Sequence, residues 1–260
     1  MTKTIHLGVT DLSFHRVTAA LVTQVLTSLG FDVKRSYRPH QDNFAKLKAG
    51  EIDMLNSAWL PSSHGVYKTD VEQAVPLIEL GLHYEPYALW GVPDYVPESD
   101  VNAVTDLLKP DVLNKMKMAI QGINPGAGIS RFSQQMLIDY GLDKAGYQFF
   151  TGTEEDCFGT FERNVAQQEW FVVPLWQPQF LHHKYNIREL QDPKGLLGVV
   201  DRAVLLLRDD RAAMFTREQL DILDSLKFGN KVIAELDYQV CREGLNCDEA
   251  AKTWLTKHFY

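Results

Sequence analysis

The sequence is poor in basic residues and has no run of them. Its 260 residues include 26 Lys and Arg against 34 Asp and Glu, which gives a formal net charge of -8. The isoelectric point is about 5.5. A negative average potential repels phosphate backbones and anionic lipid headgroups. We therefore expect no nucleic-acid partner.

Long apolar segments are also missing. No stretch reaches the ~20 apolar residues that a membrane-spanning helix requires. The first residues, MTKTIHLGVTDLSFH, lack the apolar core of a secretory signal and lead directly into a strand-like pattern. We expect either a cytoplasmic chain or an exported one without its signal.

Cysteine is scarce, with three residues in the chain. Cys241 and Cys247 lie six residues apart, so a small disulfide loop is one interpretation. Buried thiols are the alternative that we favour. No Cys-x-x-Cys pair accompanies them, and His182-His183 alone is too short a signal, so we predict no metal site.

Catalytic signatures are absent as well. The sequence contains no serine-hydrolase elbow, no H-E-x-x-H and no Cys/His nucleophile signature. Acidic neighbours at 154–156 would raise the pKa of Cys157 and oppose a role as nucleophile. Asp11 and His15 are close in sequence, but such pairs are common. We predict no catalytic residue, no cofactor and no enzyme activity.

What is present is an alternation of short apolar runs with helical patterns. This order predicts βα units and largely parallel sheets. Gly30 and Gly50 follow predicted helices, where a C-cap requires a positive φ. Capping boxes are predicted at 153–156 and 216–219. The expected strands are 4–9, 32–36, 52–56, 75–90, 117–121, 170–175 and 199–207; the expected helices are 14–29, 42–49, 126–140, 153–168 and most of the chain after 207.

Two β-rich blocks and a helical tail predict an α/β protein with two lobes. Residues 1–90 and 198–260 would form the first lobe, and residues 91–197 the second. Ligands of open α/β sheets bind outside the carboxyl ends of the strands. We therefore expect a ligand cleft between the lobes.

Two Trp-x-Pro motifs occupy matching places. Trp59-Leu60-Pro61 and Trp176-Gln177-Pro178 each follow a strand-like run. Proline suits the first turn of a helix, so each Trp is expected at the carboxyl end of a strand, one in each lobe. An indole at the lip of a cleft can hold a cation through its π face. A place in the lobe core is the alternative, but the matching positions favour the cleft.

Other aromatic residues are weaker candidates. Trp90 lies at the first predicted crossover between lobes, where it would either pack at a hinge or form a third wall of an aromatic cage. Phe14, Tyr87 and Tyr67 are further candidates for the cage, each with ordinary packing as the alternative.

A glycine-rich turn, GINPGAGIS at Gly122–Ser130, joins a predicted strand to a helix. Backbone N–H groups and the positive end of the helix dipole suit an anion there. The turn matches neither a Walker A loop nor G-x-G-x-x-G, so a carboxylate is favoured over a phosphate. A tight turn without a ligand is the alternative. Arg131 would either support the anion or lie in solvent.

His64 follows Trp59 by five residues, in WLPSSHGVY. A neutral His can donate a hydrogen bond to a carboxylate there, with a surface His as the alternative. An aromatic cage together with an anion-binding turn suits a zwitterion. Its trimethylammonium head cannot hydrogen-bond and depends on dispersion and cation–π contacts.

Several segments together resemble the substrate-binding proteins of glycine betaine ABC importers. Each is a weak match alone, but they occur in the expected order over nearly the whole chain. They are W-L-P-S-S-H-G-x-Y (Trp59–Tyr67), V-P-x-Y-V (Val92–Val96), G-I-x-P-G-A-G-I (Gly122–Ile129), the second W-x-P (Trp176–Pro178) and A-A-x-x-W-L (Ala250–Leu255).

The resemblance implies a bilobed type II periplasmic-binding fold with two mixed sheets flanked by helices. It implies that Trp59 and Trp176 cage the ammonium, while the amides of Gly126 and Ala127 and the ring of His64 hold the carboxylate. It also implies a monomer that works with ABC permease subunits, in the periplasm or otherwise outside the cytoplasm.

Two departures concern the expected cleft. Many relatives have a small residue where this chain has Trp90, and a His-aromatic pair where it has Gln179-Phe180. The ligand is therefore expected to be a quaternary-ammonium zwitterion of the glycine betaine class. A choline- or carnitine-type cation is one alternative. An intracellular ligand-sensing domain of the same fold is another.

Overall fold

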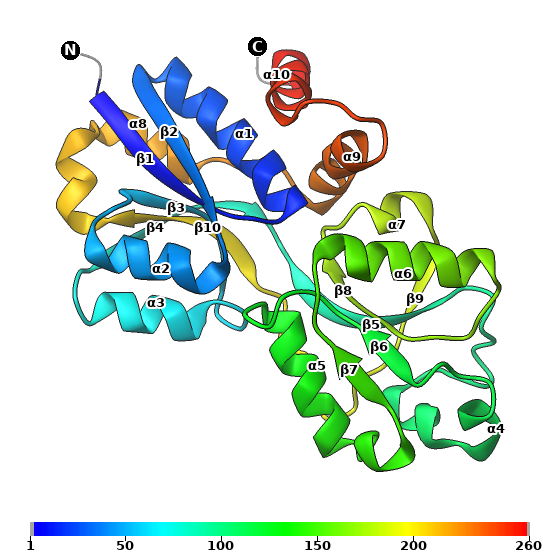
Figure 1. The fold of residues 1–260 in the computed structure, drawn as a ribbon. Coiled ribbons are helices and arrows are strands. Elements are labelled where there is room, and N and C mark those ends of the chain that lie inside the picture. Colours follow the sequence, from blue (N-terminus) through cyan, green and yellow to red (C-terminus); the bar gives the residue numbers. More distant parts are fainter. Residues whose placement is uncertain (1–2, 259–260) are drawn as a thin grey trace. The chain divides into compact units, whose positions relative to one another are not determined.

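The computed structural model describes residues 3–258, which form two compact units (Figure 1). The first unit consists of Met1–Pro86, Pro178–His183 and Asp201–Tyr260; the second consists of Tyr87–Gln177 and Lys184–Val200. The division predicted at residues 90 and 198 placed Pro178–His183 in the second lobe, whereas here this segment packs with the first unit.

The first unit is built on a five-stranded mixed sheet. Its order is β2 (Phe31–Arg38), β1 (Lys3–Thr10), β3 (Met54–Leu60), β10 (Arg202–Arg208) and β4 (Leu77–Tyr84). β1 pairs in parallel with β2 and β3, whereas β10 runs antiparallel to both β3 and β4. The prediction of largely parallel sheets is wrong for β10. This strand joins the sheet after a long excursion of the chain, so no βα crossover dictates its direction.

The strand order of this sheet reverses at β1. The chain passes from β1 to β2 on one side, and then from β2 to β3 on the other side of β1. Right-handed crossovers therefore place α1 (Ser13–Ser28) and α2 (His40–Ala49) on opposite faces, as Figure 1 shows. Loops diverge at such a reversal and leave a crevice at the carboxyl ends of the strands. Here that position lies after β1 and β3.

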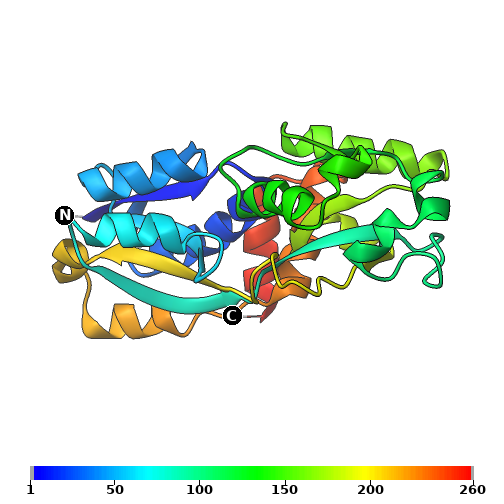
Figure 2. The same ribbon diagram turned by 90° about the horizontal axis from the view of Figure 1, so that it is seen from below.

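The remaining helices of the first unit complete its two layers. α9 and α10 pack with α1, α3 packs with α2, and α8 lies along β4; the orange α8 beside β4 is visible in both views (Figures 1 and 2). Their bounds are α3 (Gly65–Glu72), α8 (Arg217–Asp224), α9 (Asn230–Cys241) and α10 (Cys247–His258), with a 3₁₀ helix at Asp209–Met214. The short α7 (Leu181–Lys184) starts in the segment 178–183.

Central strands of the first unit are buried on both faces. Every residue of β3 is buried, and so is β10 from Ala203 onward, as expected for strands covered by helices on both sides. One apolar cluster fills the space between this sheet and α2 and α3. It contains Phe44, Leu47, Ile52, Leu55, Ala58, Leu60, Val71, Val75, Val204 and Leu206.

The second unit has two small sheets. Strands β8 (Val173–Gln177), β5 (Tyr87–Pro93) and β9 (Ile187–Glu189) form an antiparallel sheet in that order, and β6 (Ala119–Gln121) pairs in parallel with β7 (Gln148–Phe150). The antiparallel sheet again departs from the largely parallel prediction. The helices are α4 (Pro110–Leu113), α5 (Gly128–Asp139) and α6 (Glu154–Ala166), with 3₁₀ turns at Val104–Leu108 and Asp143–Ala145.

Local sequence signals located most element ends correctly. Gly30 and Gly50 have φ values of 93° and 76°, and both predicted capping boxes form, at Thr153–Asp156 and Thr216–Gln219. The single strand predicted over 75–90 is wrong. The chain forms two strands, β4 and β5, interrupted at Glu85-Pro86, because proline cannot donate to a strand ladder. Within residues 3–258, no helix has the length and apolar character to cross a bilayer.

A buried carboxylate holds the segment Pro178–His183 in the first unit. Asp237 on α9 is fully buried. It accepts a hydrogen bond from the N–H of Phe180 at 3.2 Å, and the Sγ of Cys241 lies 3.5 Å from its other oxygen. Burial raises the pKa of Asp237 to about 6, although the hydrogen bonds and the Arg242 guanidinium oppose this rise.

Replacing Asp237 by Asn should change how stability depends on pH. Between pH ~4 and ~6 the native carboxyl holds a proton that the unfolded chain has released, so this group makes the wild type less stable as pH rises through that window. The Asp237→Asn variant has no carboxyl group at this position, so it lacks this pH-dependent loss of stability. Its stability relative to wild type should improve by up to about 3 kcal/mol from pH 4 to pH 6, measured by urea unfolding at both pH values. Parallel profiles for the two proteins would contradict the raised pKa.

Candidate ligand-binding site

Aromatic and imidazole rings meet at the carboxyl ends of β1 and β3. Phe14 and His15 follow β1 at the start of α1. Trp59 is the second-last residue of β3, and His64 follows that strand. The ring of Trp59 lies 5.3 Å from Phe14, 5.7 Å from His15 and 6.2 Å from His64, measured between centroids. The strand reversal thus brings together residues about 45 positions apart.

The loop after β2 adds a third histidine. His40 begins α2, and its ring lies 5.0 Å from His64 and 6.2 Å from His15. The rings of Phe44 and Tyr67 also lie near His64, with centroids 5.6 and 6.4 Å from it. We call this group the aromatic–histidine cluster; it comprises Phe14, His15, His40, Phe44, Trp59, His64 and Tyr67.

His64 has a defined tautomer. It is buried at the N-cap of α3, and its Nδ1 accepts the backbone N–H of Trp59 at 2.9 Å. A ring nitrogen that accepts carries no proton, so the neutral ring has its proton on Nε2. The turn before it is held by Asp201, whose carboxylate accepts the N–H groups of Ser62 and Ser63 at 2.6 and 2.9 Å. The surface alternative for His64 is therefore wrong.

His15 and His40 are site residues that the sequence interpretation missed. His15 is buried, and burial, followed by the neighbouring His40, holds its pKa well below the usual value. It is therefore neutral at pH 7, and its Nδ1 has no hydrogen-bond partner within residues 3–258. Asp11, which is close to His15 in the sequence, pairs with Arg16. In the sequence, His15 lies in the helix predicted after the first strand and His40 lies shortly after the second predicted strand.

A tyrosine that sequence reasoning also missed orients Trp59. The indole Nε1–H donates to the Oη of Tyr84 at 3.0 Å, and the two rings meet edge to face at 87°. Trp59 is 7% exposed and Tyr84 is fully buried. Burial raises the pKa of Tyr84 to about 12, so the hydroxyl stays neutral. Tyr84 is the last residue of β4, two strands away, and no local pattern predicts this pairing.

In the second unit, Trp176 and Trp90 share one face of the antiparallel sheet. Trp176 pairs with Ala88 and Trp90 pairs with Pro174, and because side chains alternate along a strand, the two indoles lie diagonally on the same face. Both are buried. Trp176 packs against Phe158, with centroids 5.9 Å apart.

Trp90 also has an internal partner. Its Nε1–H donates to the Oγ of Ser133 on α5 at 2.7 Å. This contact fits the packing alternative for Trp90; its role as a cage wall stays a prediction. Tyr87 donates to Glu189 at 2.8 Å at the other end of β5.

Neither Trp-x-Pro proline begins a helix. Pro61 lies four residues before α3, and Pro178 lies three residues before α7. The helical interpretation of the two prolines is therefore wrong, because a turn intervenes in each case. The position of the tryptophans at strand ends is confirmed, since Trp59 and Trp176 are each the second-last residue of β3 and β8.

The glycine-rich turn connects β6 to α5, as predicted. A Cβ on Gly122 would approach the ring of Phe149 to 2.3 Å, so a larger residue there would require that ring to move. α5 begins without a side-chain cap, which leaves its first amides to other acceptors. The N–H of Ala127 donates to Asn124 O at 3.2 Å, and Arg131 donates to Gly126 O. Arg131 therefore closes the turn itself.

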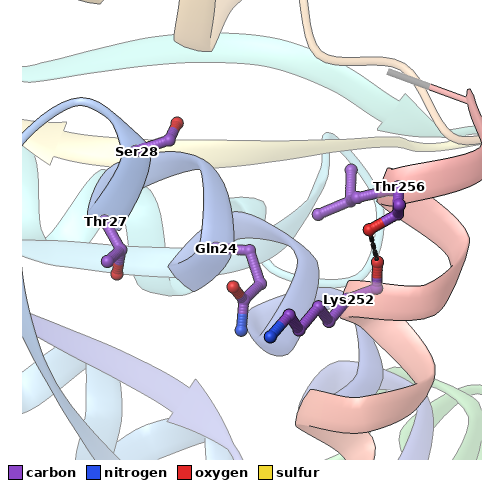
Figure 3. Close-up of a pocket in the computed structure, with 6 residues that line it drawn as sticks. Gln24, Thr27, Ser28, Lys252 and Thr256 are labelled. Carbon is purple, nitrogen blue, oxygen red and sulfur yellow. Dashed lines mark hydrogen bonds between the residues drawn. The ribbon is translucent and has the colours of Figure 1, made fainter. Parts of the chain in front are cut away.

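A groove elsewhere on the first unit is less suited to a quaternary ammonium. It has a volume of about 250 Å³ and lies between α1 and α10, lined by Gln24, Thr27, Ser28, Lys252, Leu255 and Thr256 (Figure 3). The Oγ1 of Thr256 donates to Lys252 O at 2.8 Å. This groove has a lysine and no aromatic ring, so it would repel a cation rather than stabilise one.

Nucleophile and metal chemistry find little support in the structure. Burial, and then the charges of Glu154 and Asp156, raise the pKa of Cys157 well above its usual range. Cys241 and Cys247 remain thiols, as predicted, but they are half-buried rather than buried. Over residues 3–258, no group of three or more His, Cys, Asp or Glu side chains is arranged to hold a metal ion.

Two sequence comparisons give matches. A family model described as the substrate-binding domain of ABC-type glycine betaine transport systems matches residues 3–257. The glycine betaine/carnitine transport binding protein of Listeria monocytogenes is 26% identical over 151 residues, which cover 56% of this chain and 48% of that relative. The match thus spans about half the length of the relative.

Solved structures of similar fold include three binding proteins. A lactococcal protein in a closed, liganded conformation with glycine betaine has a TM-score of 0.85 at 24% identity, over 98% of this chain and 96% of that one. A glycine betaine/L-proline-binding protein of Borrelia burgdorferi has a TM-score of 0.84 at 24% identity, over 98% of this chain and 94% of that one. An ABC-transporter choline-binding protein in complex with choline has a TM-score of 0.83 at 16% identity, over 98% of this chain and 88% of that one. These likenesses confirm the predicted bilobed α/β type II fold.

Replacing Tyr84 by Phe should destabilise the protein through Trp59. The indole N–H would lose its acceptor in a buried place, which costs about 1–3 kcal/mol. Urea unfolding measures the loss, and the Trp59 indole proton should move upfield in a ¹H–¹⁵N spectrum. Tyr87→Phe is the matched control. It removes a solvent-exposed hydrogen bond of a half-buried Tyr, so its effect should stay within about 0.5 kcal/mol. Equal effects of the two variants would show that the Trp59–Tyr84 bond contributes nothing.

Proposed function

Because the chain belongs to the substrate-binding domains of ABC-type glycine betaine transport systems, we propose that it binds a small quaternary-ammonium zwitterion of the glycine betaine class for import. The observation that carries this proposal is the aromatic–histidine cluster at the strand reversal. It offers the face of Trp59 beside Phe14 and a neutral His64 with its proton on Nε2. The proposal includes no catalytic step.

The chemistry of these side chains suits the two ends of such a ligand. A trimethylammonium group has no N–H, so it gains most from aromatic faces and dispersion. We assign this end to Trp59 and Trp176, with Phe14, Tyr87 and Trp90 as further aromatic contacts. Neutral imidazoles near the site add no positive charge to oppose the cation.

We assign the carboxylate to His64 and to the turn that begins α5. The uncapped start of α5 brings a positive dipole end and backbone N–H groups. Gly126 and Ala127 lie in this turn. Ala127 would bind a ligand by sharing or giving up its bond to Asn124.

The second candidate is a choline- or carnitine-type cation. One relative is named for carnitine, and one structural neighbour holds choline, while Trp90 adds apolar surface to the second unit. In either case the proposed partners are ABC permease subunits, and the proposed state is a monomer outside the cytoplasm. An intracellular sensor of the same fold would bind the same ligands without a permease.

The aromatic assignment predicts the effect of removing either indole. Trp59→Ala and Trp176→Ala should each weaken glycine betaine binding by about 1–2 kcal/mol or more, the range of a desolvated cation–π contact. Calorimetric titration measures this. Trp254→Ala is the control, because Trp254 packs on Phe228 and His258, away from the cluster. Affinities within twofold of wild type in both test variants would remove the aromatic assignment.

The carboxylate assignment predicts a preference between ligands. A charge-assisted hydrogen bond is worth about 1.5–3 kcal/mol, so glycine betaine should bind at least about tenfold more tightly than choline. Side-by-side titration at one pH and one salt concentration is sufficient. Choline binding as tightly as betaine would identify the ligand as a cation and the glycine-rich turn as structural.

A further inference from the structure

Gln179 is a buried amide whose donor group has no acceptor. Its side chain is 0% exposed, and its Nε2 makes no hydrogen bond to any atom of residues 3–258. An amide NH₂ carries two N–H donors. Buried donors of this kind are nearly always paired in native proteins, because leaving them unpaired is unfavourable. An absent acceptor is therefore implied.

The orientation of this amide is determined by its neighbour. The Oε1 atom accepts the N–H of Leu181 at 2.8 Å. Exchanging the oxygen and nitrogen would place an NH₂ group against an N–H donor, so the amide cannot be reversed. The two N–H groups of Gln179 must be the atoms that lack a partner.

Hydrogen bonds within the first unit tie the segment that carries Gln179 to the start of α1, where Phe14 of the aromatic–histidine cluster lies. The next residue, Phe180, donates its N–H to Asp237. Asp237 is also hydrogen-bonded by Ser13 at the start of α1. Ser13 directly precedes Phe14, whose ring lies 5.3 Å from Trp59.

Two opposite charges contact the next residue, Phe180. Asp237 carries the carboxylate that anchors Phe180, and Arg242 holds its guanidinium 4.3 Å from the centroid of the Phe180 ring. Because these charges oppose one another, a ligand oxygen near Gln179 would depend mainly on the amide hydrogens.

We propose that Gln179 is a specificity-determining residue that donates a hydrogen bond from Nε2 to an oxygen of the ligand. This inference rests on the proposed function. Gln179 would add a neutral donor for a carboxylate, which has about four acceptor positions and can use more than His64 and the α5 amides supply. This role predicts that the protein binds ligands with both an ammonium group and an oxygen acceptor more tightly than ligands with the ammonium group alone.

Two variants separate donation from support of the loop. Gln179→Glu keeps an oxygen for Leu181 N–H but removes both N–H donors, and Gln179→Met removes acceptor and donors at similar size. Each is titrated with glycine betaine and with tetramethylammonium, which has the cationic head and no acceptor. Both variants should bind glycine betaine at least about tenfold more weakly. Tetramethylammonium affinity should change less than threefold.

A matched control and three outcomes decide the test. Gln167→Glu places the same added charge at an exposed position and should leave both affinities unchanged. Equal losses for both ligands would mean that Gln179 only supports the loop. Unchanged betaine affinity would assign the two N–H groups to a bound water. In both cases the proposed function stands and this inference fails. Wild-type protein that binds neither ligand would overturn the proposed function, and this inference with it.

Discussion

The reversal of strand order at β1 is the constraint on which the site depends. Crossovers to β2 and to β3 must both be right-handed, so α1 and α2 leave on opposite faces and the loops after β1 and β3 diverge. That divergence brings Phe14 and His15 to Trp59 and His64. A different strand order would leave the same residues in separate loops. The topology of the first unit therefore decides which side chains meet at the site.

Several polar groups of the first unit are neutral. His15 is kept uncharged by burial and by His40, Tyr84 is kept protonated by burial, and Gln179 carries no charge. A buried positive charge would repel an ammonium strongly, since the low local dielectric strengthens the interaction. Neutral donors can bind an anion without opposing the cation of the same ligand. This combination suits a zwitterion better than a simple anion or cation.

The buried charge in this region is confined to a supporting role. Asp237 lies under the segment that carries Gln179 and Phe180, and its hydrogen bonds connect α9 with that segment. Such an ion is costly to bury unless its partners are in place. Because the hydrogen bonds of Asp237 go to Phe180, Ser13 and Cys241, this carboxylate supports the segment and the start of α1. The thiol of Cys157 stays protonated because burial raises its pKa, so it is a poor nucleophile.

The sequence by itself determined features that depend on neighbours along the chain. Capping boxes, helix-ending glycines and the strand-end positions of Trp59 and Trp176 follow from local backbone requirements, so they could be predicted. The class of protein followed from motifs spread over the chain. The tertiary structure alone decided that His15 and His40 join His64, that Tyr84 orients Trp59, and that Pro178–His183 belongs with the first unit. These pairings join residues far apart in sequence, and their energies arise only when folding has removed the groups from water.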